Sequence, residues 1–220
     1  MKKLRVLVLS DEIDRALYDH FDRSMLQDID MIISCGDLPA RYLTFLATMF
    51  NGPVLYVCGN HDEKYVTNPP EGCICIEDEI YEYQGIRFLG LGGSRRYKKG
   101  PFQYTEVQME KRIHKLWYPL WRKKGFDVLV THSPAKDHGD GKGAHEGFPC
   151  FNRLIEKYRP SWFFYGHMHL SYDANTPRVS RLGDTSTVNA FGKYVVEVEV
   201  PENGDTHRSA DGDGGSQLEQ

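Results

Sequence analysis

Short apolar runs alternate with longer amphipathic stretches along most of the chain. The apolar runs are bounded by Gly, Pro, Asn or Asp, as buried strands usually are. They predict strands at residues 4–9, 31–34, 54–57, 87–91, 128–131 and 162–165. Apolar positions at helical spacing predict helices at 12–21, 41–50, 105–116 and 148–158. Thr105 and Gln108 form the capping box expected at the start of the third helix.

Two further regions, 73–84 and 178–200, alternate apolar with polar residues and contain turn residues such as Gly85, Gly183 and Gly192. A period of two residues predicts antiparallel strands. The strand–helix repeats elsewhere are typical of parallel sheets. We therefore expect an α/β fold in which the sheets are mixed and the helices lie outside them.

The length of 220 residues suffices for one sizeable core and is short for two. We expect a single domain over residues 1–200. From Pro201 onward the sequence is rich in Gly, Asp and Ser and has almost no apolar side chains to bury, so we expect a disordered tail over 201–220.

The composition is that of a globular protein, and no apolar run is long enough to cross a bilayer. Arg5 interrupts the apolar run near the N-terminus, which argues against a signal peptide. The five cysteines are odd in number and include no C-x-x-C pair, which indicates reduced thiols. We expect a cytoplasmic protein without a membrane partner.

Polar residues stand where the predicted strands end. Asp11, Asp37, Asn60, His132 and His167 each follow one of these strands closely, and His169 lies two residues further on. In open α/β sheets the carboxyl ends of the strands form the edge where ligands bind. These separate segments of sequence are therefore expected to meet at one point.

Carboxylates, an amide oxygen and imidazoles together suit a divalent transition metal such as Mn, Fe, Zn or Co. Each residue alone has a more ordinary explanation. Asp11 and Asp37 could cap the helices that follow them, Asn60 could form a turn, and a single His is more often a satisfied polar side chain than a ligand. Their joint placement at strand ends favours a metal site.

The sequence resembles the calcineurin-like metallophosphoesterases. The pattern of that family is D-x-H, G-D, G-N-H-[DE], H and G-H-x-H. This chain has GD at 36–37, GNHD at 59–62, TH at 131–132 and GHMH at 166–169, in that order. The resemblance covers about nine-tenths of the chain and implies two packed mixed β-sheets flanked by helices, an α-β-β-α sandwich.

The resemblance also implies the roles of the site residues. One metal would be held by Asp11, Asp37 and His169, and a second by Asp37, Asn60, His132 and His167. A water or hydroxide bridging the metals would attack the phosphorus atom. His61 would protonate the leaving oxygen, and Asp62 would orient His61.

One block departs from the family pattern. Where the family has D-x-H, this chain has Asp11, Glu12 and Ile13, and isoleucine cannot bind a metal. Asp14 or solvent could replace the missing imidazole. The site is therefore expected to hold one or two metal ions, with the first held more weakly.

These features predict a hydrolase, a phosphatase or phosphodiesterase, acting on a small-molecule or nucleotide phosphoester, and Arg95 is a candidate contact for the substrate phosphate. Two alternatives stay open. Some proteins of this fold serve as interaction scaffolds with weak or no catalysis. A nuclease could use the basic cluster Arg95, Arg96, Lys98 and Lys99, but a net charge of −4 does not favour nucleic acid.

Overall fold

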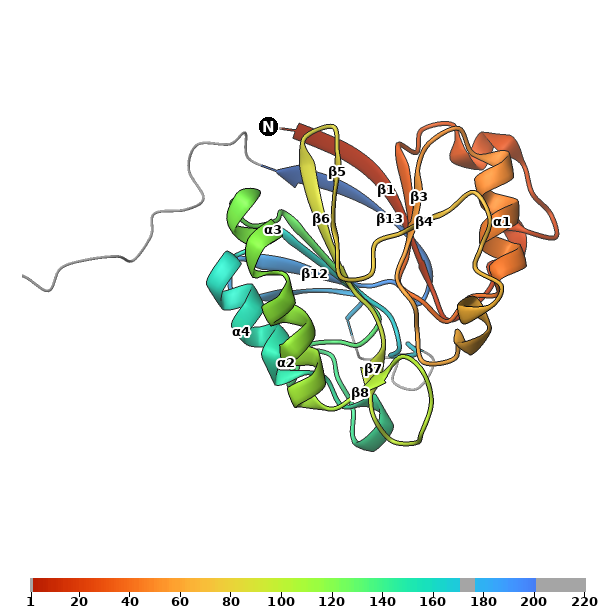
Figure 1. Ribbon diagram of the computed structural model, residues 1–220. Coiled ribbons are helices and arrows are strands. Elements are labelled where there is room, and N and C mark those ends of the chain that lie inside the picture. The colour runs from red at the N-terminus through yellow and green to blue at the C-terminus, as the bar shows by residue number, and fades with distance from the viewer. Residues whose placement is uncertain (1, 171–176, 201–220) are drawn as a thin grey trace, which may run out of the picture.

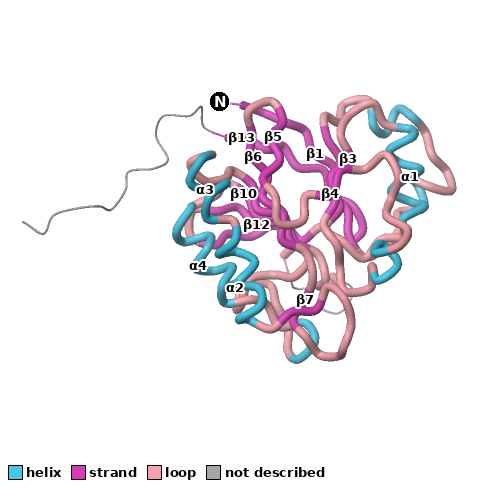
Figure 2. The backbone as a smooth tube through the Cα atoms, viewed as in Figure 1, coloured by secondary structure: helices cyan, strands magenta, loops and turns pink. Residues whose placement is uncertain are grey.

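Two β-sheets lie face to face, and helices cover the outer face of each sheet (Figures 1 and 2). The computed structural model describes residues 2–170 and 177–200. The tail predicted at 201–220 lies outside the described residues. The layers follow the order helix, sheet, sheet, helix, as the resemblance implied.

The first sheet has the strand order β13-β1-β2-β3-β4. Its strands are β1 (Lys2–Ser10), β2 (Met31–Ser34), β3 (Val54–Tyr56), β4 (Ile74–Cys75) and β13 (Gly192–Val200). Strands β1 to β4 are parallel, and β13 runs antiparallel to β1 at the edge. The expectation that 73–84 is antiparallel is therefore wrong for β4, because the chain crosses from β3 and returns in the same direction.

The second sheet has the order β11-β12-β10-β9-β6-β5. Its strands are β5 (Ile80–Tyr83), β6 (Ile86–Leu91), β9 (Val128–Thr131), β10 (Trp162–Tyr165), β11 (Val179–Leu182) and β12 (Thr185–Asn189). The four central strands are parallel, and both edge strands are antiparallel to their neighbours. A separate parallel pair joins β7 (Ser94–Arg95) to β8 (Gln103–Tyr104). The prediction of mixed sheets is confirmed.

Helix α1 (Ala40–Met49) covers the first sheet, and α2 (Glu106–Lys115), α3 (Trp117–Arg122) and α4 (Pro149–Tyr158) cover the second (Figure 1). The capping box of Thr105 and Gln108 is present at α2. The helix expected at 12–21 is wrong. The carboxylate of Asp14 accepts the N–H of Leu17, so this segment forms the single 3-10 turn η1 (Arg15–Leu17) instead.

Three apolar clusters fill the spaces between the layers. Along β1, Leu4, Val6 and Val8 point between the sheets, whereas Leu7 and Leu9 point toward α1. Both faces of the central strands are therefore buried, which explains their continuous apolar runs in the sequence. Outside these clusters, Arg87 at the start of β6 pairs with Asp127 before β9, with each side chain 9% exposed.

Candidate metal centre

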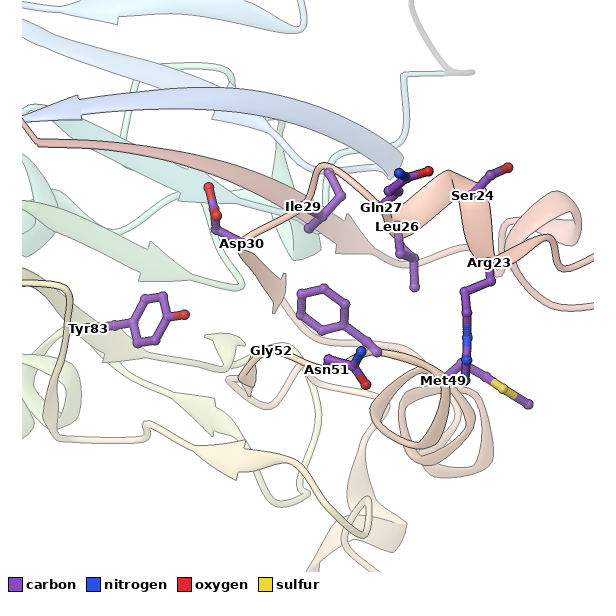
Figure 3. A pocket seen from close by; sticks show the side chains of 11 residues that line it. Arg23, Ser24, Leu26, Gln27, Ile29, Asp30, Met49, Asn51, Gly52 and Tyr83 are labelled. Atoms are coloured by element: carbon purple, nitrogen blue, oxygen red, sulfur yellow. The ribbon is translucent and has the colours of Figure 1, made fainter.

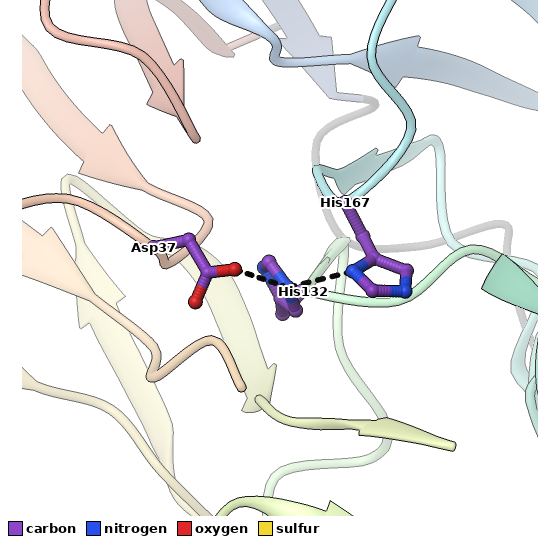
Figure 4. A group of neighbouring side chains, drawn as sticks. All are labelled: Asp37, His132 and His167. Carbon is purple, nitrogen blue, oxygen red and sulfur yellow. Dashed lines mark hydrogen bonds and ion pairs between the residues drawn. The ribbon is translucent and has the colours of Figure 1, made fainter. Parts of the chain in front are cut away.

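Four side chains from different segments converge on one point, centred on His132. Three groups surround its Nε2 atom: Asn60 Oδ1 at 3.0 Å, His167 Nδ1 at 3.1 Å and Asp37 Oδ2 at 3.3 Å. Figure 4 shows three of these side chains turned toward one another. The predicted ligands of the second metal therefore lie together.

The strands bring these residues together because parallel strands end at a common edge. Asp37 follows β2, Asn60 follows β3, His132 follows β9 and His167 follows β10. At the strand ends the backbone turns sharply, with φ of 58° at Asp37 and 66° at His167. Non-glycine residues rarely adopt such values, and they are concentrated at functional sites. The turns direct both side chains across the edge of the sheets.

Backbone carbonyls fix the orientation of two imidazole rings. Nδ1 of His132 lies 2.8 Å from the carbonyl oxygen of Cys35, and Nε2 of His167 lies 2.8 Å from that of Ala144. A carbonyl oxygen only accepts hydrogen bonds, so each of these nitrogens donates its proton. In the neutral rings the other nitrogen then carries a lone pair, and both lone pairs point at the same place.

The charges in this cluster favour a cation. Burial lowers the pKa of His132, but the charge and hydrogen bond of Asp37 outweigh burial and raise the pKa to about 10. Burial raises the pKa of Asp37, but the charge and hydrogen bond of His132 lower it to about 2. Burial and the charge of His132 lower the pKa of His167 to about 4. Without a metal, the Asp37 carboxylate thus favours a proton on Nε2 of His132, at the position where a cation such as a metal ion would be bound instead.

Two imidazole nitrogens, a carboxylate oxygen and an amide oxygen form a donor set that suits a divalent transition metal. The ligand atoms of Asp37, His132 and His167 lie within 4.8 Å of one another. The orientation of both rings by outer carbonyls is the arrangement that metal-binding histidines usually have. The residues therefore fit a metal ion, because their ligand atoms already lie together in the rotamers present.

A second group of candidate ligands adjoins the first. Asp11 Oδ1 lies 3.7 Å from His169 Nε2, and Asp11 Oδ2 accepts the backbone N–H of His167 at 2.9 Å. Burial opposes ionisation of Asp11, but the hydrogen bonds from His169 and Ser10 and the charge of His132 together outweigh it and lower the pKa of Asp11. Asp11 therefore faces the histidines and does not cap a following helix.

The altered D-x-H block has a clear structural counterpart. Ile13 is half-buried and packs against the apolar cluster beneath α1. The carboxylate of Asp14 accepts the N–H of Leu17 and pairs with Lys193 Nζ at 3.0 Å. Asp14 is thus engaged away from the pair formed by Asp11 and His169.

His61 and Asp62 lie beside the cluster in different ways. The exposed His61 donates its backbone N–H to Asp37 Oδ1 at 2.7 Å. Asp62 is buried, and its carboxylate accepts the N–H groups of Asp37 at 2.8 Å and Gly59 at 2.7 Å. Burial raises the pKa of Asp62 to about 7. Asp62 therefore ties two ligand-bearing turns together.

Two glycines allow these turns to touch. A Cβ atom on Gly59 would lie 2.0 Å from Asp37 Oδ1, and one on Gly166 would lie 1.9 Å from Ser10 Oγ. Any side chain at either position would push a candidate ligand or its neighbour aside. The glycines preceding Asn60 and His167 are thus explained by close approach of the backbone.

The guanidinium of Arg95 is engaged by carboxylates. It lies 3.1 Å from Glu106 and 3.7 Å from Glu146, and it also packs over the ring of Phe148. Arg96 donates to the side chain of Gln108 at 2.9 Å. Two members of the basic cluster are thus held by contacts within the protein.

Some contributors to the site give no signal in the sequence. Asn60 donates from Nδ2 to the hydroxyl of Tyr97 at 3.2 Å, which directs its Oδ1 toward His132. The carboxylate of Glu77 accepts the N–H groups of Cys58 at 2.7 Å and Gly92 at 3.1 Å, and it pairs with the buried Arg112. Neither Tyr97 nor Glu77 belongs to a recognisable motif, so neither could be identified from the sequence.

Two cavities differ in their relation to this centre. One, of about 590 Å³, is lined by Asp30, Gly52 and Tyr83 among others, at the end of the sheet where β2 and β3 begin (Figure 3). The other, of about 680 Å³, is lined by Asp37 and His61. The second cavity therefore adjoins the candidate metal centre.

Two curated proteins are similar to this chain in sequence. The UPF0046 protein T07D4.2 of Caenorhabditis elegans is 27% identical over 106 residues, covering 47% of this chain and 26% of that protein. Lariat debranching enzyme A of Xenopus laevis is 20% identical over 220 aligned positions, covering 74% of this chain and 41% of that enzyme. This chain therefore spans less than half the length of these curated relatives.

Solved structures share the fold. The protein TT1561 of Thermus thermophilus superposes with a TM-score of 0.59 at 17% identity, covering 87% of this chain and 90% of that one.

In the part of the chain that the structure describes, no helix is long and apolar enough to cross a membrane. The sequence model of the calcineurin-like phosphoesterases matches residues 4–171, which include all six candidate ligands, and this chain belongs to that family.

Proposed function

We propose that this protein is a metal-dependent hydrolase of phosphomonoesters or phosphodiesters. The observation that carries the proposal is the convergence of Asn60, His167 and Asp37 on the Nε2 atom of His132, within 3.3 Å. Backbone carbonyls aim both imidazole lone pairs at that place. A purely structural role would not require two oriented lone pairs, a carboxylate and an amide oxygen to face one another.

The proposed ligands fall into two sets that share Asp37. Asn60, His132 and His167 would complete one set, and Asp11 and His169 would complete the other. Bound divalent metal, with manganese the first to test, would act as a Lewis acid that activates water and neutralises phosphoryl oxygens. The second set lacks the imidazole of the family pattern, because Ile13 packs against apolar side chains.

His61 is the proposed general acid. Its backbone N–H is fixed on Asp37, while its imidazole is exposed at the wall of a cavity beside the cluster. From this position it would donate a proton to the leaving oxygen. Asp62 would act indirectly, because its carboxylate holds the turns of Asp37 and Gly59 in place. Arg95 stays a prediction, and a substrate phosphate would have to compete with Glu106 and Glu146 for it.

The proposed location is the cytoplasm. All five cysteines are free thiols, and three of them, Cys35, Cys58 and Cys150, are buried. Burial raises the pKa of each of these thiols and keeps it protonated. Reduced, unreactive thiols are typical of proteins that work in a reducing compartment.

The test combines metal analysis with two assays. Metal per chain is measured after loading with Mn²⁺, and turnover is then followed on an aryl phosphomonoester and an aryl phosphodiester. His61→Ala should retain the wild-type metal content and lose about a hundredfold in turnover, the usual scale of general acid catalysis. His20→Ala, an exposed histidine in the segment after η1, is the matched control and should retain full activity.

The same measurements separate the alternatives. A chain that binds metal but hydrolyses neither ester would be an interaction scaffold of this fold. Equal loss of metal and activity in His61→Ala would make His61 a ligand and not an acid. Hydrolysis of a single-stranded oligonucleotide with strong salt dependence would favour a nuclease.

A further inference from the structure

A cavity opens beside the metal centre on the side of His61. Its volume is about 680 Å³, and its walls are the first turn of α1 and the 3-10 turn η3 (Glu63–Val66). Side chains around it include Asp37, Arg41, His61, Lys64 and Asn68. The proposed general acid and a bridging ligand therefore form one wall, and two cationic residues belong to the other walls.

The positive charges of Arg41 and Lys64 are not paired with a carboxylate in the part of the chain that the structure describes. Both side chains are exposed, and no carboxylate forms an ion pair with either of them in the described ranges 2–170 and 177–200. Arg95 and Arg112, by contrast, pair with Glu106 and Glu77. Arg41 and Lys64 thus keep their charges available to a ligand in the cavity.

The carboxylates of the cavity wall are committed elsewhere. The carboxylate of Asp62 accepts two backbone N–H groups and is buried. Asp37 accepts the N–H of His61 and faces His132, toward the proposed metal. An anion in the outer part of the cavity would therefore meet the two cations more directly than the two carboxylates.

Helix α1 adds to this preference. It begins at Ala40, and Pro39 at its N-cap provides no side-chain acceptor for the first N–H groups. Pro39 and Ala40 both line the cavity, so the positive end of a ten-residue helix is presented to it. The helix dipole and the two side chains act in the same direction.

From these observations we propose that the cavity is a subsite for a second phosphate, carried by the alcohol half of the substrate. The proposal rests on the proposed function, because it follows from His61 standing at the leaving oxygen. The alcohol that leaves past His61 would then enter this cavity. The preferred substrate class is a phosphoester whose leaving alcohol bears another phosphate, so that one group reaches the metal and the other reaches Arg41 and Lys64.

The test measures binding with ligands that a phosphoesterase cannot hydrolyse. Propane-1,3-bisphosphonate and propylphosphonate differ by one anionic group, and their C–P bonds resist hydrolysis. Each is titrated calorimetrically into the Mn²⁺-loaded protein. The wild type should bind the bisphosphonate about fivefold to tenfold more tightly, the scale of two exposed cation–anion contacts. The matched variant is Arg41→Gln combined with Lys64→Gln, for which the two ligands should bind within about twofold of each other.

Two controls protect the interpretation. Lys111→Gln with Lys115→Gln removes the same charge from the exposed face of α2, in the opposite helical layer, and should keep the wild-type preference. Metal content of all variants should match the wild type. A preference that persists without Arg41 and Lys64 would mean that the second phosphonate contacts the metal, and it would overturn the subsite.

Absence of any preference in the wild type, or of binding by either ligand, would also overturn the proposal. Its failure is distinguishable from failure of the proposed function. If the protein hydrolyses no ester but binds the bisphosphonate more tightly through Arg41 and Lys64, the anion subsite is correct and the proposed hydrolase activity is wrong. If the protein hydrolyses esters but binds both ligands equally, the hydrolase activity is correct and the subsite is wrong.

Discussion

Replacing Gly59 by alanine should weaken metal binding more than it weakens the fold. The added Cβ would lie 2.0 Å from Asp37 Oδ1, 2.5 Å from Asp37 Cγ and 2.6 Å from Asp37 N. The carboxylate and the turn must separate by more than about 1 Å to restore ordinary contact distances. That movement is a substantial fraction of the 3.3 Å that separates Asp37 Oδ2 from His132 Nε2.

Overpacking of this kind costs about 1–3 kcal/mol. For a chain of this length each kcal/mol lowers the melting temperature by about 2–4 °C, so the metal-free variant should melt about 2–12 °C lower. Displacing even an outer contact of a metal ligand costs about tenfold to a hundredfold in affinity. Since Asp37 is itself a proposed ligand, the loss for Mn²⁺ in Gly59→Ala should be at least that large.

The measurement is a calorimetric titration of metal-free protein with Mn²⁺, accompanied by thermal unfolding. Gly100→Ala is the control, because its Cβ would meet the ends of the Glu63 and Gln103 side chains at 3.2 Å and 3.5 Å, which can move aside. Gly100→Ala should bind Mn²⁺ as the wild type does. If Gly59→Ala also bound Mn²⁺ with unchanged affinity, the position of the Asp37 carboxylate would be irrelevant to the metal and the assigned ligand set would be wrong.

Three further outcomes are expected. Asp37→Ala should abolish most Mn²⁺ binding at both positions, measured as metal per chain, and two retained ions would refute the shared carboxylate. Ile13→His should raise Mn²⁺ affinity about tenfold because it adds a ligand. It should lower the stability of the metal-free chain by about 1 kcal/mol because it removes an apolar contact. Unchanged affinity would place position 13 out of reach of the metal. Asp127→Asn should cost about 3–5 kcal/mol in urea unfolding, because it leaves Arg87 buried without its counter-charge. Lys123→Gln, which removes a surface pair, should cost less than about 1 kcal/mol, and a similar loss in both variants would contradict this reasoning.

The strands were the most predictable part of the fold. Runs such as 31–34 and 128–131 are buried on both faces, so the sequence is apolar at every position but the last, where each run ends at a polar residue. Helix α3 was missed because it has only six residues and contains Pro119, which usually marks a break in a helix. The expected helix at 12–21 failed because side-chain oxygens of Asp14 and Asp22 bind nearby N–H groups.

The grouping of the candidate ligands was also predictable, for a physical reason. Parallel strands end at one edge, so polar residues that follow them must lie near one another whatever the loops do. The orientation of those residues was not predictable. It depends on the backbone carbonyls of Cys35 and Ala144, and a carbonyl is present at every position in the chain. The pairing of Arg95 likewise depends on where the fold places Glu106 and Glu146, which no sequence motif links to it.

The hydrogen bond from His167 to Ala144 would couple a surface loop to the kinetics of metal exchange at the proposed site. Ala144 lies in the 3-10 turn η4 (Gly143–His145), within the glycine-rich stretch that precedes α4. While the loop is closed, the ring of His167 is held with Nδ1 facing His132. If this loop opened, the ring of His167 would lose this restraint, and a bound ion would lose one donor. Residence time of the metal should therefore follow the opening rate of this loop, so two variants with equal affinity at equilibrium could release their metal at very different speeds.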